Sequence, residues 1–263
     1  MTASAIFADG LLDGRHVLVT GGGTGIGLAI ARECGRLGAR VTLAARRENI
    51  LAEACAALKG EGIDAAWRGL NIRDNDAVLA AYESIAAERG LPDFLVNNAG
   101  GQFGAKADDI SANGFRAVMD LNVQGNWQMS HAFAQRHRAA GTPGRIVNIV
   151  FAHTDAMVFF AHAAAARAAV VNLTRTLALE WSEHGILVNA VGPGPVTTEG
   201  VDQYDEEMSG SRLIERMPVG RWGRPEEVAW LVAYLLGPAG DWITGSFFPL
   251  DGGAQLAGRR FEP

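Results

Sequence analysis

A cluster of five glycines within seven residues constrains this chain more than any other feature. Residues 20–27 read Thr-Gly-Gly-Gly-Thr-Gly-Ile-Gly, directly after an apolar run and before a helical pattern. At such a junction glycines let the backbone turn tightly and approach phosphates, while the helix N-terminus supplies free N–H groups. The segment therefore predicts a dinucleotide-binding loop, with contacts from Gly21, Thr24, Gly25, Ile26 and Gly27.

Short apolar runs alternate with helical stretches along the whole chain. Runs that are apolar nearly from end to end are typical of strands covered on both faces; they are residues 16–20, 41–45, 65–70, 94–97, 145–150, 187–191 and 247–250. The alternation predicts an α/β chain with a single-domain, Rossmann-type doubly wound fold: a seven-stranded parallel sheet with helices on both faces. No linker or repeat divides residues 1–263, and the irregular stretch 192–225 is expected to be a substrate-binding loop or lid.

Composition excludes several classes of protein. The net charge of −6 argues against a nucleic-acid-binding face. The two cysteines, Cys34 and Cys55, lack any metal-ligand spacing and are expected to be buried thiols, so no metal site is predicted. We find no signal-peptide pattern, and the most apolar stretch, 156–166, is too short to cross a bilayer. The sequence ends Arg-Arg-Phe-Glu-Pro, which is not a peroxisomal tripeptide. The expectation is a cytoplasmic protein with neither a membrane nor a nucleic-acid partner.

The end of the second predicted strand distinguishes between the two nicotinamide dinucleotides. NAD-binding proteins usually place a carboxylate there for the ribose 2′-hydroxyl, whereas arginine suits a 2′-phosphate. This chain has Ala45 followed by Arg46 and Arg47, with no acid before Glu48. The cofactor is therefore predicted to be NADP(H).

Further motifs resemble those of the short-chain dehydrogenase/reductase family over nearly the whole chain. They are the glycine spacing, an Asn-Asn-Ala-Gly segment at 97–100, a helical Asn122 and a Pro-Gly-Pro-Val-Thr-Thr segment at 193–198. The resemblance implies further cofactor contacts from Asn71, Ile72, Asn98, Gly100, Arg167, Gly194, Val196 and Thr198. It also implies that two long helices, over 114–137 and 161–183, pair with a second copy in a homo-oligomer, either a dimer or a tetramer.

The family's catalytic Ser, Tyr and Lys are missing. Val150 or Phe151 stands at the Ser position, Ala163 at the Tyr position and Arg167 at the Lys position. These replacements resemble the branch that contains peroxisomal trans-2-enoyl-CoA reductase, the 2,4-dienoyl-CoA reductases and bacterial dehydrogenases of terpenoid-alcohol catabolism. That resemblance implies an NADPH-dependent reductase of an enoyl thioester, with the acyl thioester as its small-molecule partner.

Reduction of an enoyl thioester tolerates the loss of the tyrosine, because negative charge develops on the thioester oxygen and can be stabilised by hydrogen-bond donors. Asn122, His162 and Arg167 are the predicted catalytic residues. Phe103, Phe151, His153 and Tyr204 are predicted to contact the substrate, and the proton comes from water, His162 or Tyr204.

Each of these assignments has an alternative. Asn122 either acts on the substrate or binds a backbone carbonyl, and His162 is either a donor or a core histidine. The apolar stretch 157–160 lines an acyl pocket or belongs to the core or a subunit interface. For the whole protein, two other readings stay open: a carbonyl or alcohol oxidoreductase with a rearranged site, and a cofactor-binding protein without turnover.

Overall fold

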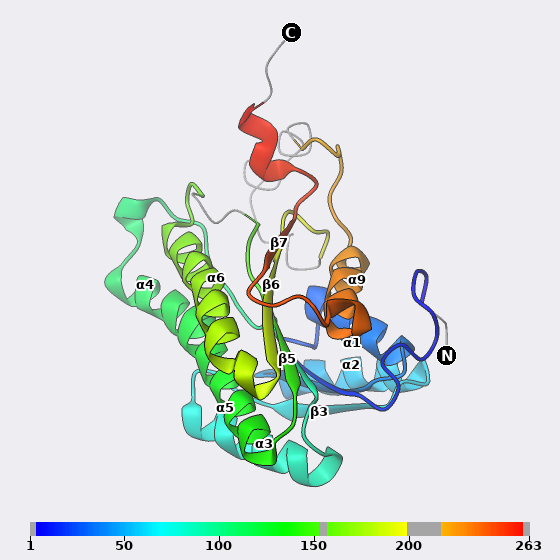
Figure 1. The fold of residues 1–263 in the computed structure, drawn as a ribbon. Helices are drawn as coiled ribbons and strands as arrows, with labels where there is room; N and C mark the ends of the chain where they lie inside the picture. The colour runs from blue at the N-terminus through cyan, green and yellow to red at the C-terminus, as the bar shows by residue number, and fades with distance from the viewer. Residues whose placement is uncertain (1–3, 153–156, 199–216, 260–263) are drawn as a thin grey trace.

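The computed structural model describes residues 4–152, 157–198 and 217–259 (Figure 1). Strands and helices alternate along these residues, as the sequence predicts. The strands are β1 (His16–Thr20), β2 (Arg40–Ala45), β3 (Ala65–Gly69), β4 (Phe94–Asn97), β5 (Gly144–Ile149), β6 (Ile186–Pro193) and β7 (Phe247–Leu250). The helices are α1 (Gly25–Arg36), α2 (Glu48–Gly60), α3 (Asn75–Arg89), α4 (Ala112–Met119), α5 (Gly125–Ala140), α6 (Ala161–Trp181) and α9 (Pro225–Leu236).

The strands form one seven-stranded parallel sheet in the order β3-β2-β1-β4-β5-β6-β7. The chain starts at β1, runs outward to β3, then returns to β4 and continues in the other direction. A crevice forms at such a reversal, outside the carboxyl ends of the strands, and ligands of open α/β sheets bind there. The predicted fold class is confirmed.

Alternate residues of each strand enter two different apolar layers. Val17 and Val19 of β1 belong to the cluster formed with α1, α2 and α9, whereas Leu18 belongs to the cluster formed with α3, α5 and α6. In Figure 1 these two sets of helices lie on opposite sides of the sheet. Because both faces are covered, the strands are apolar nearly throughout, which is why they stand out in the sequence.

The long helix predicted over 114–137 is interrupted by a turn of π-helix at Asp120–Gln124, between α4 and α5. Asn122 explains the interruption, because its Nδ2 donates to the carbonyl of Val118, 2.8 Å away. In a regular α-helix that carbonyl would accept the backbone N–H of Asn122 itself. The wider turn places the Asn122 side chain at the carboxyl edge of the sheet, beside Gly101.

At the amino ends of the strands, His16 is fully buried at the start of β1. Its ring connects β2 to the residue that follows α3. Its ring nitrogens lie 3.1 Å from the carbonyl of Gly90 and 2.8 Å from Oγ1 of Thr42. Burial lowers the pKa of His16 from 6.5 to about 4. The folded protein therefore holds this histidine neutral at pH values where the unfolded chain protonates it.

The pH dependence of stability is expected to follow. Above pH 6.5 the ring is neutral in both the folded and the unfolded state, so it does not change the free energy of unfolding. As the pH falls from 6.5 to 4 only the unfolded state gains the proton, so about 3 kcal/mol of unfolding free energy is lost. Urea unfolding of wild type and His16→Gln at pH 7.5, 6 and 4.5 checks this, since the variant removes the titration. Parallel curves for the two proteins would contradict it.

The remaining expectations concern the cysteines, membranes, metals, assembly and location. Cys34 and Cys55 are both buried and unpaired. Within the described ranges, no helix combines the length and apolarity needed to span a membrane, and no three metal-ligating side chains cluster. The homo-oligomer and the cytoplasmic location stay predictions.

Candidate active site

The glycine loop joins β1 to α1 at the carboxyl edge of the sheet, next to the crevice. Gly21 and Gly25 have φ angles of 64° and 52°, which side chains with a Cβ rarely adopt. A Cβ at Gly27 would collide with the carbonyl oxygen of Gly21 and lie 2.5 Å from Nδ2 of Asn98. The first turn of α1 can therefore lie against the loop only because these positions are glycine.

Asn98, which follows β4, holds this loop in place. Its Nδ2 donates to the carbonyls of Thr20 and Gly21, at 3.1 and 3.2 Å. In return, Oγ1 of Thr20 accepts the backbone N–H groups of Asn98 and Ala99, each at 3.0 Å. Asn98, predicted to bind cofactor, thus shapes the cradle with both amide hydrogens.

The start of α1 has the features of an anion site. Thr24 precedes the helix in an extended conformation and makes no side-chain cap, and no acidic residue occupies the first turn. The N–H groups of Gly25, Ile26 and Gly27 therefore have no hydrogen-bonding partner among the described residues. The methyl group of Thr198 lies 3.5 Å from where a Cβ of Gly25 would be, so Thr198 faces the same turn from the other wall of the crevice.

The second wall follows β6. Val196 pairs with Gly223 in a parallel bridge, in which Pro195 and Thr197 make the hydrogen bonds. The N–H and C=O of Val196 consequently point away from Gly223 and have no partner in the described structure. Gly194 packs against Asp251, where a Cβ would lie 2.6 Å from the Asp251 side chain. A free backbone donor and acceptor on one residue suit a carboxamide, as the family resemblance implied for Val196.

At the adenosine end, Arg46 and Arg47 follow β2, with exposed guanidinium groups that form no ion pair or hydrogen bond among the described residues. The neighbouring carboxylate of Glu48 does not pair with either arginine. It lies against Gly69 of β3, on the side of β2 away from β1. The next strand ends near Asn71, whose Oδ1 accepts from the backbone N and Nε of Arg73 at 3.3 and 3.4 Å. Ile72 is buried against Gly125. This end of the crevice is therefore electropositive.

Arg167 on α6 carries a buried guanidinium that has no acidic partner among the described residues. The residue is 6% exposed, and burial is what lowers the pKa of Arg167, to about 10, so it stays charged near neutral pH. Nη1 donates to the carbonyl of Ile149 at 2.9 Å, and the guanidinium lies 5.2 Å from the centre of the Phe151 ring. Nε is buried without a partner. Such a charge is costly unless a ligand supplies an electron-rich atom.

Gly100 lies between Arg167 and Asn122. A Cβ on Gly100 would collide with Nη2 of Arg167 and lie 2.7 Å from Oδ1 of Asn122. The Asn122 amide is otherwise occupied: Nδ2 donates to the carbonyls of Gly101 and Val118, and Oδ1 accepts from Gly101 N at 3.3 Å. Asn122 thus binds backbone groups on both sides, which was the alternative left open for it.

His162 opens α6 and is fully buried. Its Nδ1 accepts the N–H of Ala163 at 2.8 Å, whereas Nε2 is buried without a hydrogen-bonding partner. The edge of its ring meets Phe103, with centroids 4.4 Å apart and planes at 90°. Burial lowers the pKa of His162, so the ring is neutral near pH 7. The structure brings His162 together with Phe103 and not with Arg167.

The missing catalytic groups leave apolar surfaces. Val150 and Ala163, at the Ser and Tyr positions, are buried. Ala163 packs with Phe160, and Phe151 lies against the same cluster. His153 and Tyr204, both predicted to contact the substrate, fall outside the described residues.

Sequence reasoning missed the groups that hold Arg167. The Ile149 carbonyl has no sequence signature, because every residue carries one. Phe151 was assigned to the substrate, although its ring covers the guanidinium. A weak signal existed, since a residue at the end of β5 faces the helix that crosses it in this fold.

Comparisons with known proteins agree with this arrangement. A family model described as "Enoyl-(Acyl carrier protein) reductase" matches residues 21–255. The peroxisomal 2,4-dienoyl-CoA reductase of Arabidopsis thaliana is 35% identical, over 98% of this chain and 90% of that protein.

Two solved structures are similar over most of their length. The citronellol catabolism dehydrogenase of Pseudomonas aeruginosa PAO1 has a TM-score of 0.85 and 34% identity, covering 95% of this chain and 98% of that one. The gluconate 5-dehydrogenase of Burkholderia cenocepacia J2315, solved with NADP and tartrate, has a TM-score of 0.87 and 32% identity. The match covers 94% of this chain and 98% of that one. With its sheet order, glycine cradle and matching family model, the chain belongs to the short-chain dehydrogenase/reductase family of oxidoreductases.

Proposed function

We propose that this oxidoreductase uses NADPH to reduce the carbon–carbon double bond of an enoyl-CoA thioester. The observation that carries the proposal is the buried guanidinium of Arg167, whose Nε has no hydrogen-bonding partner among the described residues, combined with an alanine where a tyrosine would protonate a ketone oxygen. The similarity to 2,4-dienoyl-CoA reductase supports it independently.

The described residues fit a bound dinucleotide from end to end. The free N–H groups of α1 and the Thr198 side chain would hold the pyrophosphate, and the backbone of Val196 would hold the carboxamide. The buried Nε of Arg167 would bind a ribose hydroxyl or the substrate oxygen. When bound, the dinucleotide supplies the hydride.

The protein's own part is to stabilise charge on the thioester oxygen. A guanidinium in a site shielded from water stabilises a developing oxyanion far better than it would in water. Phe151 and the Ile149 carbonyl fix the plane of Arg167, so no reorganisation is needed when charge develops. Asn122 orients Gly101 and the loop that carries Phe103, which makes it a positioning residue.

Protonation of the α-carbon completes the reaction. His162 has a buried Nε2 without a hydrogen-bonding partner among the described residues, and the ring is neutral near pH 7. A neutral imidazole can donate this proton only weakly, so we assign it to relaying a proton from water.

A panel of substrates tests the proposal. NADPH oxidation is measured with trans-2-butenoyl-CoA and a dienoyl-CoA, and separately with 5-ketogluconate and simple ketones. Turnover of the thioesters alone is expected. Turnover of the ketones alone would replace the proposal with carbonyl reduction, for which the gluconate 5-dehydrogenase similarity is the precedent. Tight NADPH binding without any turnover would indicate a cofactor-binding protein.

The preference for NADPH over NADH depends on Arg46 and Arg47. The double variant Arg46→Ala/Arg47→Ala is expected to raise the KM for NADPH by about 10- to 100-fold, since two charge-assisted bonds to the 2′-phosphate are lost. The KM for NADH should hardly change, because that cofactor has no such phosphate. Steady-state kinetics with both cofactors measures this.

Exposed Arg138→Ala, on α5 and far from the crevice, is the matched control. Equal changes for NADPH and NADH in the double variant would contradict the assignment of these arginines.

A further inference from the structure

Large apolar side chains are exposed together at one side of the candidate active site. Phe115 of α4 is 41% exposed, and Val158, in the turn before α6, is 78% exposed. Met157 and Phe159 beside Val158 are also exposed, while Ile110 and Met119 are half-buried. We call these six residues the apolar rim. Contiguous exposed apolar surface of this kind marks a binding site more often than chance.

The rim is built from two segments that the fold brings together. α4 packs along α6, and the loop before α4 is tied to the turn before α6, because Ala105 N donates to the carbonyl of Phe159 at 2.9 Å. Phe159 has a φ of 67°, a strained conformation for a residue with a Cβ. This hydrogen bond holds the turn in a conformation that leaves three apolar side chains in a row unburied.

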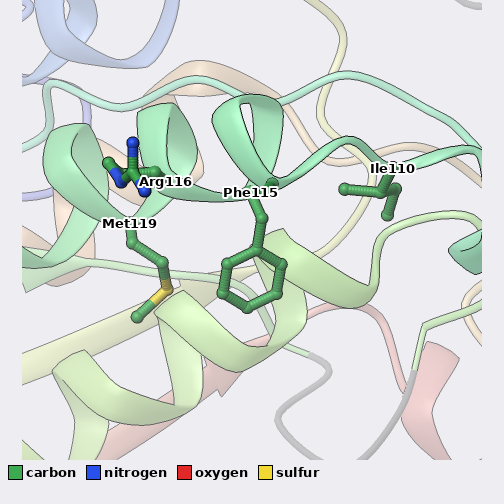
Figure 2. Close-up of a pocket in the computed structure, with 5 residues that line it drawn as sticks. Ile110, Phe115, Arg116 and Met119 are labelled. Carbon is green, nitrogen blue, oxygen red and sulfur yellow. The ribbon is translucent and has the colours of Figure 1, made fainter.

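Part of the rim is hollowed. Ile110, Ala112, Phe115, Arg116 and Met119 line an open groove on α4. Figure 2 shows Phe115 and Met119 projecting from the same side of α4, toward α6. Arg116 supplies the charged group of the groove and is bonded to Asn113 Oδ1 at 3.3 Å.

The rim is continuous with the proposed catalytic groups. Met119 packs against the cluster of Val118, Phe160 and Ala163, and Phe151, which covers Arg167, lies against the same cluster. On the other side, Phe103 touches Gly114 of α4 and the ring of His162. Through these contacts the rim adjoins the side chains packed around Arg167 and His162.

The chemistry of the rim selects its occupant. The side chains of Ile110, Phe115, Met119, Met157, Val158 and Phe159 offer no strong hydrogen-bond donor or acceptor. A sugar acid or the amide-containing arm of coenzyme A would lose its hydrogen bonds to water over these six side chains, and only Arg116 of the groove's lining, already bonded to Asn113, carries a charge. A hydrocarbon chain loses none and gains from each methylene that leaves water.

We infer that the apolar rim binds the acyl chain of the thioester, so that the enzyme prefers medium or long chains over short ones. This rests on the proposed function, because the chain is placed relative to Arg167. On this inference residues 157–159 belong to an acyl surface, whereas Phe160 is buried in the core.

Affinity for saturated acyl-CoA tests the rim without requiring turnover. Isothermal titration of the NADP⁺-loaded protein is carried out with butanoyl-CoA and decanoyl-CoA. Decanoyl-CoA is expected to bind at least about tenfold tighter, since even partial burial gives roughly twofold per methylene. In Phe115→Ser and Val158→Ser that gain should shrink severalfold, while butanoyl-CoA affinity stays the same. Trp242→Ser is the matched control, because Trp242 is 98% exposed just before β7, at the opposite edge of the sheet.

Turnover then separates this inference from the function on which it rests. Reduction of butenoyl-CoA and dodecenoyl-CoA with equal KM would overturn the acyl surface and leave the proposed function standing. Binding that depends on chain length, without any reduction of either thioester, would support the acyl surface and overturn the proposed function. If Phe115→Ser instead dissociates an oligomer in light scattering and leaves acyl affinity unchanged, the rim is a subunit interface and the inference is wrong.

Discussion

Arg167→Met is expected to lower kcat/KM for an enoyl thioester by about 100-fold or more, while the cofactor-free protein becomes no less stable. The catalytic loss follows from removing the positive charge beside the developing oxyanion. The unchanged or increased stability, by up to about 2 kcal/mol, follows because the guanidinium is buried with no acidic partner in the described part of the chain, and methionine fills a similar volume. Urea unfolding and steady-state kinetics on the same preparations measure both effects.

Arg145→Met is the matched control, because Arg145 is a second largely buried arginine but a fully partnered one. Its Nη1 donates to the carbonyls of Leu235, Leu236 and Gly237, which end α9, and its Nη2 pairs with Asp241. Removing these partners is expected to cost about 2 kcal/mol of stability and to leave the activity of the folded protein unchanged.

The contrast between the two arginines is what makes the prediction informative. If Arg167→Met destabilised the protein as much as Arg145→Met does, Arg167 would be a structural residue. If its kcat/KM were unaffected, charge stabilisation at the thioester oxygen would need another donor. Retained stability with lost activity is the pattern expected of a group held in a costly environment for its function.

The fold could be predicted because its signals are local. Strands such as β1 and β5 are buried almost throughout, so each contains a run of apolar residues, Val17–Val19 in β1 and Ile146–Val147 in β5, whatever the order of the strands in the sheet. The cofactor loop is equally local, since the φ angles of Gly21 and Gly25 require glycine at those positions. Arg46 and Arg47 lie after β2, where the sequence places them, and their contact with the cofactor stays a prediction.

Candidates for catalysis could be proposed from the sequence, but the contacts that decide between their alternatives could not, because those join distant residues. Asn122 meets Gly101 across the crevice, and that contact makes it a positioning residue rather than a free donor. His162 was predicted as either a core residue or a donor, and the structure shows features of both: a buried ring and an unpartnered Nε2. The apolar rim needed the fold as well, since α4 contributes Phe115 and Met119 to a surface that the sequence indicates only at 157–160.

Gly27→Ala is expected to abolish tight dinucleotide binding. The added Cβ would collide with the Gly21 carbonyl and lie 2.5 Å from Nδ2 of Asn98, which is the group that ties the loop to β4. Neither can move alone, so the loop and the first turn of α1 must separate, and the N–H groups that face the phosphates move with them. A displacement of about 1 Å at such a site weakens binding by roughly 100-fold, and the strain costs about 2 kcal/mol of stability.

Gly60→Ala isolates this steric cause from the general effect of replacing a helical glycine. Gly60 ends α2, and no atom lies within 4 Å of where its Cβ would be. Alanine there is expected to stabilise the protein by about 0.5 kcal/mol, through the lower entropy of the unfolded chain, with an unchanged Kd for NADPH. NADPH titrations of both variants, followed by fluorescence, then decide the point. If Gly27→Ala bound NADPH as tightly as Gly60→Ala, the close contact between α1 and the loop would be dispensable, and the phosphates would have to lie elsewhere in the crevice.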